Sequence, residues 1–344
     1  MKKYLNRLYV TSQGSYLNKE GETVVVSVEQ EKKLQLPLHN LDGIVCFGNV
    51  LCSPFLMGAC AEKGITISHL TEYGRFLASI KGATTGNVLL RREQYRKADD
   101  LMISAKLAKN MILGKIANCK TVLSRALRDH TEKIDTTKIE LVTQSLSQSI
   151  KSLMDNDFNL DQLRGVEGDA ARDYFSVFNE LIIAQKTDFK FKGRNRRPPR
   201  DRVNCLLSFI YTLLTHDIRS ALESVGLDSY VGFFHRDRPG RPSLALDLME
   251  EFRPFLADRL VLSLINLKQI SGNDFIDSTT GGILMNEETR KTVLINYQKR
   301  KQEEIFHPFI QEKIKIGLLF HVQALLLARY IRGDLDGYPV FIWK

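Results

Sequence analysis

The sequence is poor in cysteine, and its few cysteines are not grouped. The 344 residues contain five of them, an odd number without a CxxC pair. A disulfide framework needs an even set, and a zinc ribbon needs two close pairs. The pattern therefore predicts neither, and it indicates reduced thiols in a cytoplasmic protein. The cysteines are Cys46, Cys52, Cys60, Cys119 and Cys205.

Long hydrophobic runs are also missing. The opening residues, MKKYLNRLYV, contain no apolar stretch of signal-peptide length. The most apolar segment, LLFHVQALLLARYI near the C-terminus, is interrupted by His321 and Gln323. This segment predicts a buried helix and not a membrane span. We therefore expect a cytoplasmic location and no membrane partner.

Signatures of several common enzyme classes are absent as well. There is no GxSxG segment and no Cys/His pairing that predicts a covalent nucleophile. The pair Gly281 and Gly282 lacks the strand, loop and helix that surround a phosphate-binding loop. The sequence therefore predicts neither a nucleotide cofactor nor a side-chain nucleophile.

Basic residues are in excess, with 49 Lys and Arg against 40 Asp and Glu, which gives a net charge of +9. This excess indicates a polyanionic partner. Eight basic residues against two acidic ones fall in KTDFKFKGRNRRPPRDR, residues Lys186–Arg202. Guanidinium groups bind phosphate oxygens in pairs, so we expect this loop to contact DNA; the alternative is a solvated, partly disordered loop. The predicted DNA-binding residues are Lys192, Arg194, Arg196, Arg197 and Arg200, together with Arg238 and Arg241 of a later turn.

The pattern of the chain changes near Gly82–Val88. Before it, short β-rich runs alternate with turns, and one helix is expected at Pro54–Glu62. The segment GATTGN is the predicted hinge, and almost wholly helical periodicity follows it. The prediction is an α+β fold with a β-rich dimerisation domain at residues 1–85 and an all-α catalytic domain at residues 86–344. The later expected helices include Phe255–Ile270, one capped by Asn286, and Pro308–Arg332.

One carboxylate lies on the apolar face of an expected helix. Between Asp161 and Ile183 apolar residues recur every three or four positions, and Glu167 falls four residues after Leu163, on the same face. A buried carboxylate without a partner costs several kcal/mol, on the order given by transfer and mutational data. We therefore expect a metal ion or a cationic side chain beside Glu167, and Arg164 is the nearest cationic alternative.

A second group of candidates surrounds a stiff turn. In GFFHRDRPGRPSLALDLMEEFR, His235 precedes a Pro/Gly turn, and Asp247, Glu250 and Glu251 lie on the helix that follows. An imidazole and a carboxylate brought together across such a turn can form half of a divalent-metal site. The sequence predicts that Glu167 completes this site.

Three segments in this order resemble a known family. They are RGVEGDAARDYF, RPPRDRVNCLLSFIYTLLTHDIRSALESVGLD and GFFHRDRPGRPSLALDLMEEFRP, and the likeness extends over essentially the whole chain. They resemble the CRISPR-associated integrase family, the spacer-acquisition endonuclease of CRISPR systems, in its type I-C form. The resemblance implies that Glu167, His235 and Glu250 hold Mg²⁺ or Mn²⁺ and that Asp247 supports them. Glu250 stands where some members have aspartate.

The resemblance also implies a reaction and partners. The 3′-OH of a DNA fragment would attack a phosphodiester of a CRISPR repeat, without ATP, in a homodimer joined to a small ferredoxin-like companion as a hetero-hexamer. Alternatives are a structure-specific nuclease for branched DNA and a non-catalytic basic DNA-binding scaffold. We expect dimerisation through the β domain, with sheet edges and apolar runs such as Val24–Val28. The aromatic tail Gly333–Lys344 is expected to dock on that domain or on a partner.

Overall fold

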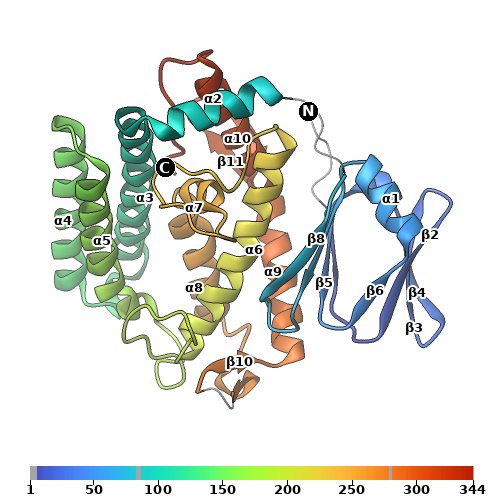
Figure 1. The fold of residues 1–344 in the computed structure, drawn as a ribbon. Helices are drawn as coiled ribbons and strands as arrows, with labels where there is room; N and C mark the ends of the chain where they lie inside the picture. The colour runs from blue at the N-terminus through green and yellow to red at the C-terminus, as the bar shows by residue number, and fades with distance from the viewer. Residues whose placement is uncertain (1–5, 83–86, 279–280, 344) are drawn as a thin grey trace. The chain divides into compact units, whose positions relative to one another are not determined.

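The computed structural model describes residues 6–82, 87–278 and 281–343. By its internal contacts the chain divides into two compact units, Met1–Gly86 and Asn87–Lys344. The predicted arrangement of an N-terminal β region followed by a helical part is confirmed (Figure 1). Most of the predicted hinge GATTGN lies outside the described residues.

The N-terminal unit contains two four-stranded sheets. In the first, parallel pairing joins β1 to β5 and β5 to β7, while β8 is antiparallel to β7. Its order is β1 (Asn6–Val10), β5 (Leu41–Phe47), β7 (Thr66–Leu70) and β8 (Phe76–Ile80). The second has the order β4 (Glu31–Pro37), β3 (Thr23–Val28), β2 (Ser15–Glu20) and β6 (Val50–Cys52), and a 3-10 turn, Leu38–Asn40, separates β4 from β5.

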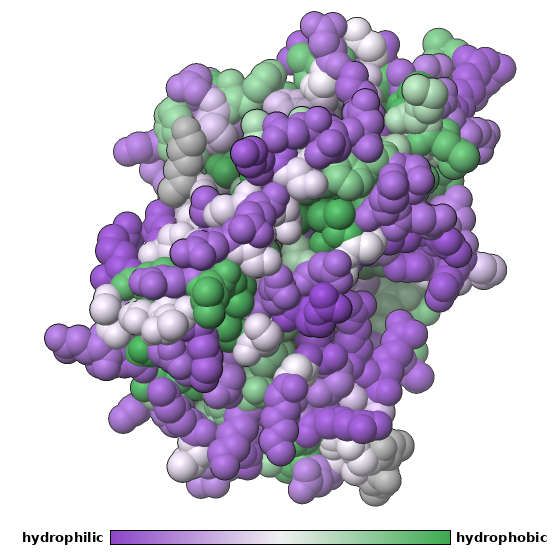
Figure 2. Space-filling view, turned by 90° about the vertical axis from the view of Figure 1, so that its left-hand side faces the viewer, coloured by the Kyte–Doolittle hydropathy of each residue, from purple (hydrophilic) through white to green (hydrophobic). Residues whose placement is uncertain are grey.

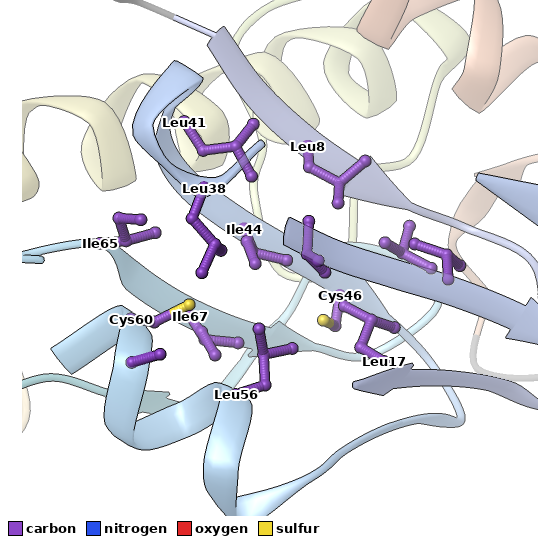
Figure 3. Packing of buried hydrophobic residues seen from close by; sticks show 14 of the residues in the cluster. Leu8, Leu17, Leu38, Leu41, Ile44, Cys46, Leu56, Cys60, Ile65 and Ile67 are labelled. Atoms are coloured by element: carbon purple, nitrogen blue, oxygen red, sulfur yellow. The ribbon is translucent and has the colours of Figure 1, made fainter. Parts of the chain in front are cut away.

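The predicted helix of this unit is confirmed as α1 (Pro54–Glu62), which begins after Ser53 because that hydroxyl accepts a hydrogen bond from the Leu56 amide. Apolar side chains from both sheets and from α1 share one core. Figure 3 shows Leu17, Ile44 and Leu56 in this core. Burial of such side chains is the main term that stabilises the unit.

The apolar run Val24–Val28, named with the sheet edges as part of the expected dimer surface, lies inside a sheet. β3, which contains Val24–Val28, lies between β4 and β2, so both of its edges are already paired. Val24 and Val25 are 0% and 1% exposed. The run therefore offers no free sheet edge, and its Val24 and Val26 belong to the unit's own core; dimerisation through this domain stays a prediction.

The second unit is a helical assembly (Figure 1). The longest helix, α3, starts after Asp100, whose carboxylate accepts hydrogen bonds from the Met102 and Ile103 amides. The helices of this unit are α2 (Val88–Asp99), α3 (Leu101–His130), α4 (Thr136–Asp155), α5 (Leu160–Ser176), α6 (Arg202–Ser224), α7 (Ser243–Met249), α8 (Arg259–Asn266), α9 (Glu287–Gln302) and α10 (Ile316–Arg332).

The outer side of this assembly is polar. Figure 2 shows the side of the molecule on which α4 and α5 lie in Figure 1, and hydrophilic residues cover most of it, with small separate groups of apolar ones. α4 accordingly buries only one stripe of side chains, which are Ile139, Leu146 and Leu153.

The helical unit differs from the all-α prediction in two places. Short antiparallel ribbons join β9 (Phe275–Asp277) to β10 (Ile283–Met285) and β11 (Glu304–His307) to β12 (Glu312–Lys315). Because of the second ribbon, the helix predicted from Pro308 begins only at Ile316.

Two further helix predictions had different outcomes. The helix predicted from Phe255 is a π-helical turn, Arg253–Asp258, that continues into α8. The N-cap at Asn286 is confirmed, since its side chain accepts a hydrogen bond from the Thr289 amide.

The C-terminal tail packs inside the helical unit. Tyr338, Phe341 and Trp343 are buried, and the amide of Phe341 donates to Glu251 over 2.7 Å. The amide of Trp343 donates to Asn118 of α3 over 2.8 Å. Both docking sites expected for the tail are therefore wrong, because its aromatic side chains pack against Phe255 inside the tail's own unit.

Within the described ranges, no helix combines the length and the apolar character required to cross a membrane.

A carboxylate and histidine site in the helical unit

The candidate side chains come from three separate segments. Glu167 is in the middle of α5, His235 is in the loop before α7, and Glu250 follows the last turn of α7. Helix α3 packs against both α5 and α7 and contributes Lys115 between them. The structure thus places the sequence-predicted residues around a lysine that the sequence reasoning missed.

Lys115 bridges the two glutamates. Its ammonium contacts Glu167 Oε1 and lies 2.7 Å from Glu250 Oε2. The side chains of Lys115 and Glu250 are 9% and 2% exposed, against 24% for Glu167. Burial by itself would lower the pKa of Lys115, but the charges of Glu250 and Glu167 raise it above its ordinary value. The ammonium is therefore a permanent cation at this site.

Glu250 has a second cationic neighbour. Arg253, three residues later, approaches Glu250 Oε1 to 2.5 Å. Burial would raise the pKa of Glu250, but Arg253, Lys115 and His235 together hold it well below its usual range. Glu250 is therefore ionised, which is the form that can bind a cation.

His235 is fixed by Asp247 and not by the glutamates. Its Nδ1 lies 2.6 Å from Asp247 Oδ1, which leaves Nε2 on the other side of the ring, 3.9 Å from Glu250 Oε1. Asp247 is completely buried and also accepts hydrogen bonds from the amides of Phe233, Phe234 and His235. A carboxylate behind a histidine in this way fixes the ring orientation and raises its basicity as a ligand.

A glycine permits this close approach. A Cβ at Gly232 would lie 2.7 Å from Asp247 Oδ2 and 2.8 Å from the Ser243 Cβ. Any larger residue would push the loop away from α7 and break the three amide contacts with Asp247. The GFFH segment is therefore shaped around the Asp247 carboxylate, which gives that residue a positioning role.

The arrangement fits a hard divalent cation in its donor chemistry. Two carboxylates and one imidazole suit Mg²⁺ or Mn²⁺ better than zinc. Within residues 6–82, 87–278 and 281–343, however, the ligand atoms of Glu167, His235 and Glu250 do not all lie within 4.8 Å of one another. The Lys115 ammonium lies between the two carboxylates and neutralises the charges that a bound metal ion would otherwise neutralise.

The cationic partner of Glu167 is a different residue from the one expected. Arg164 binds Asp161 at 2.6 Å and donates to the Phe234 carbonyl at 3.0 Å, so it ties α5 to the GFFH loop. Helical spacing could have revealed Lys115, because it lies three residues after Ile112 on the buried face of α3.

The predicted DNA-binding loop is anchored at several points. Phe189 and Phe191 are buried, and the Phe191 amide donates to Asn179. Arg194 is directed inward: its guanidinium donates to Asn204 at 2.7 Å and lies over the Tyr211 ring. Arg194 therefore shapes the loop. The side chains left at the surface are Lys192, Arg196, Arg197 and Arg200, and in the later turn Arg238 is exposed and Arg241 half-buried.

Comparison with known proteins gives consistent matches. A family model described as CRISPR associated protein Cas1 matches residues 8–299. A CRISPR-associated endonuclease Cas1 of Chlorobaculum tepidum is 58% identical over 344 residues and covers 100% of both chains. Among solved structures, a Cas1 protein from Thermotoga maritima has a TM-score of 0.82 at 23% identity, covering 97% of this chain and 99% of its own. A casposase bound to an integration product has a TM-score of 0.84 at 22% identity, covering 97% and 93%. These two structures establish the fold.

Proposed function

Since this chain belongs to the Cas1 family, we propose that it is a metal-dependent DNA endonuclease and integrase that inserts new spacers into a CRISPR array. The observation that carries this proposal is the site itself. A buried, ionised Glu250 lies 3.9 Å from the imidazole of a histidine that a buried aspartate orients, and Lys115 joins Glu250 to a glutamate of α5. A purely structural ion-pair network does not require an imidazole turned toward a carboxylate in this way.

We assign Glu167, Glu250 and His235 Nε2 as the ligands of Mg²⁺ or Mn²⁺. When bound, such an ion polarises a phosphodiester and stabilises charge that develops in the transition state. Asp247 keeps His235 in one orientation, and Arg253 holds the Glu250 carboxylate in place. Lys115 balances the two glutamates and stands within reach of any phosphate that approaches them.

The nucleophile in this proposal belongs to the DNA. The 3′-OH of an incoming fragment attacks a phosphodiester at the repeat boundary, and the displaced 3′-oxygen leaves as the new bond forms. One phosphodiester replaces another, so the exchange requires no ATP. With water in place of the 3′-OH, the same residues hydrolyse DNA, which is the runner-up function of a structure-specific nuclease.

We propose double-stranded DNA as the substrate and the exposed part of the basic loop as one of its contacts. Both ends of one fragment have to be joined, and each chain has one such site, so a homodimer is the smallest sufficient assembly. The family resemblance adds a small ferredoxin-like companion, a hetero-hexamer and the type I-C subtype as further elements of the proposal.

The test is strand transfer of a short duplex into a supercoiled plasmid that carries CRISPR repeats, with Mn²⁺ or Mg²⁺, with and without the companion protein. We expect joined products from the native chain and none from His235→Ala. The matched control is His130→Ala, which removes an exposed histidine at the end of α3 and should leave the yield unchanged.

The products distinguish the alternatives. Cleaved but never joined DNA would favour the nuclease. Near-native joining by His235→Ala would contradict the assigned site. Binding without cleavage or joining under every condition would leave the DNA-binding scaffold.

A further inference from the structure

Three side chains of the N-terminal unit that can bind metal lie close together, although their spacing along the sequence matches no metal-binding motif. Cys46 is on β5, Cys52 ends β6 and His69 is on β7. Their ligand atoms, two Sγ and one imidazole nitrogen, all lie within 4.8 Å of one another. In the part of the chain that the structure describes, this is the one such group of three or more His, Cys, Asp or Glu residues.

The topology of the unit produces this meeting. Cys46 and His69 are register partners in the parallel pair β5 and β7, so their side chains stand side by side on one face of the first sheet. Cys52 comes from the second sheet, where it pairs with Leu17 of β2. The cluster therefore lies between the two sheets and connects them.

Packing alone explains only part of the cluster. A buried cysteine often acts as a small apolar residue, and Cys46, with no exposed surface, belongs to the core drawn in Figure 3. Cys52 and His69 are partly exposed, however, and a core has no need of a thiol and an imidazole directed at the same sulfur. Their exposure also provides a path by which an ion can enter.

The distances suit a tetrahedral ion. With Zn–S near 2.3 Å and Zn–N near 2.0 Å, two ligands of one zinc ion stand roughly 3.5–3.8 Å apart. Since the three ligand atoms lie within 4.8 Å of one another, each pair has to approach by about 1.3 Å at most.

We propose that Cys46, Cys52 and His69 form a binding site for Zn²⁺ that fastens the two sheets of the N-terminal unit together. Two soft sulfur donors and one imidazole select zinc over Mg²⁺ or Mn²⁺. Three protein ligands leave the fourth position to solvent. Because the ion binds the folded unit and bridges strands from both sheets, it stabilises the fold by mass action.

The experiment uses the full chain, reduced and stripped of metal with a chelator. One equivalent of Zn²⁺ is added and the bound zinc is counted after desalting; Co²⁺ then replaces it as a spectroscopic probe. Cobalt bound to thiolate has a charge-transfer absorption in the near ultraviolet. The carboxylate and histidine site contains no thiolate, so this absorption reports on the N-terminal unit alone.

We expect one zinc ion per chain, a cobalt–thiolate absorption and a rise of several degrees in Tm on adding Zn²⁺. Cys52→Ala and His69→Gln should each lose the absorption and the rise in Tm. Cys205→Ala, which removes a buried cysteine of α6, is the matched control and should keep both. Should Cys52→Ala fail to fold, His69→Gln decides the matter.

Two results would overturn the proposal. One is a native chain without the cobalt–thiolate absorption, or an absorption that survives in both variants. The other is a chain that binds no zinc when reduced and loses two titratable thiols in air only while Cys52 is present. That second result would identify a redox-active pair instead of a metal site.

Discussion

The two candidate metal sites of this chain differ in their donor atoms. In the helical unit the donors are carboxylates and an imidazole, and two cations, the buried Lys115 and the partly buried Arg253, already balance the carboxylate charge. In the N-terminal unit the donors are two sulfurs and an imidazole between apolar sheets. The first should select a hard ion and the second a soft one.

The contrast also concerns what each site does without metal. Charges in the helical site satisfy one another, so it remains assembled, but an incoming ion has to share the carboxylates with Lys115. The thiol cluster has no such competing cation among its three members. The metal affinity of the helical site should therefore depend on how strongly Lys115 competes for the carboxylates. The metal affinity of the N-terminal site should depend on its two cysteine ligands.

Removal of Lys115 should have the largest effect, because it changes both the stability of the helical site and its competition with a metal ion. Lys115→Met leaves Glu167 and Glu250 without their shared cation and should lower the free energy of unfolding by about 3–5 kcal/mol, the usual cost of breaking a buried pair. Urea unfolding measures this loss. Mn²⁺ should then raise the Tm of the variant more than that of the native chain, because the ion no longer competes with the ammonium.

The control for this experiment is Lys106→Met, a change at an exposed position of the same helix, and it should have little effect on stability. If Lys115→Met is as stable as the native chain, or if Mn²⁺ stabilises the two equally, then Lys115 does not occupy the place of the cation.

Loss of the carboxylate behind His235 should come next. Asp247→Asn replaces an acceptor of three amides by a group with one acceptor atom, so the ring orientation loosens and DNA cleavage should fall roughly 10–100-fold. A cleavage time course in Mn²⁺ measures it, with the exposed Asp237→Asn as control. An inactive Asp247→Asn chain, equal to His235→Ala, would instead identify Asp247 as a ligand.

The basic loop allows its outward and inward arginines to be compared. Alanine at Arg196, Arg197 and Arg200 should weaken DNA binding and reduce the slope of log affinity against log salt by about one unit for each phosphate that the loop no longer binds. Stability should barely change. Arg194→Ala should instead lower the stability and leave the salt slope of DNA binding nearly unchanged, since this guanidinium binds Asn204 and Ser208. Equal salt slopes for the triple variant and the native chain would return the loop to a solvated role.

A further expected effect is a pH dependence of the stability of the helical unit. Burial raises the pKa of Glu251 to about 8, although Tyr338, Phe341 and Gln323 bind it. The folded chain therefore keeps a proton that the unfolded chain loses near the ordinary value of 4.5. This contribution to stability is complete below that value and is lost as pH rises to about 8, by at most about 1.4 kcal/mol per pH unit.

Urea unfolding at pH 5.5, 7 and 8.5 measures this dependence, and Glu251→Gln should flatten it because no proton is then exchanged. The tail amide of Phe341 still finds an acceptor in the glutamine oxygen. A variant with the same pH slope as the native chain would place the ionisation elsewhere.

Local patterns in the sequence were sufficient for much of the fold. The asparagine before α9 marked where that helix begins, because capping is decided within a few residues. The three- and four-residue spacing around Glu167 placed it on the inner side of α5. His235 and Glu250 could be singled out from one stretch of chain and a family resemblance, and they lie near one another as expected.

The features that could be predicted from the sequence alone are therefore local: the helices, their caps and which of their faces is apolar, since these depend on neighbours three or four residues away. It took the folded chain to show that Lys115, and not Arg164, balances Glu167, and that the tail fills its own unit. The meeting of Cys46, Cys52 and His69 between two sheets is likewise a product of the fold. The partner of a buried charge or thiol is chosen by packing between segments far apart in the chain, and no spacing along the sequence records that choice.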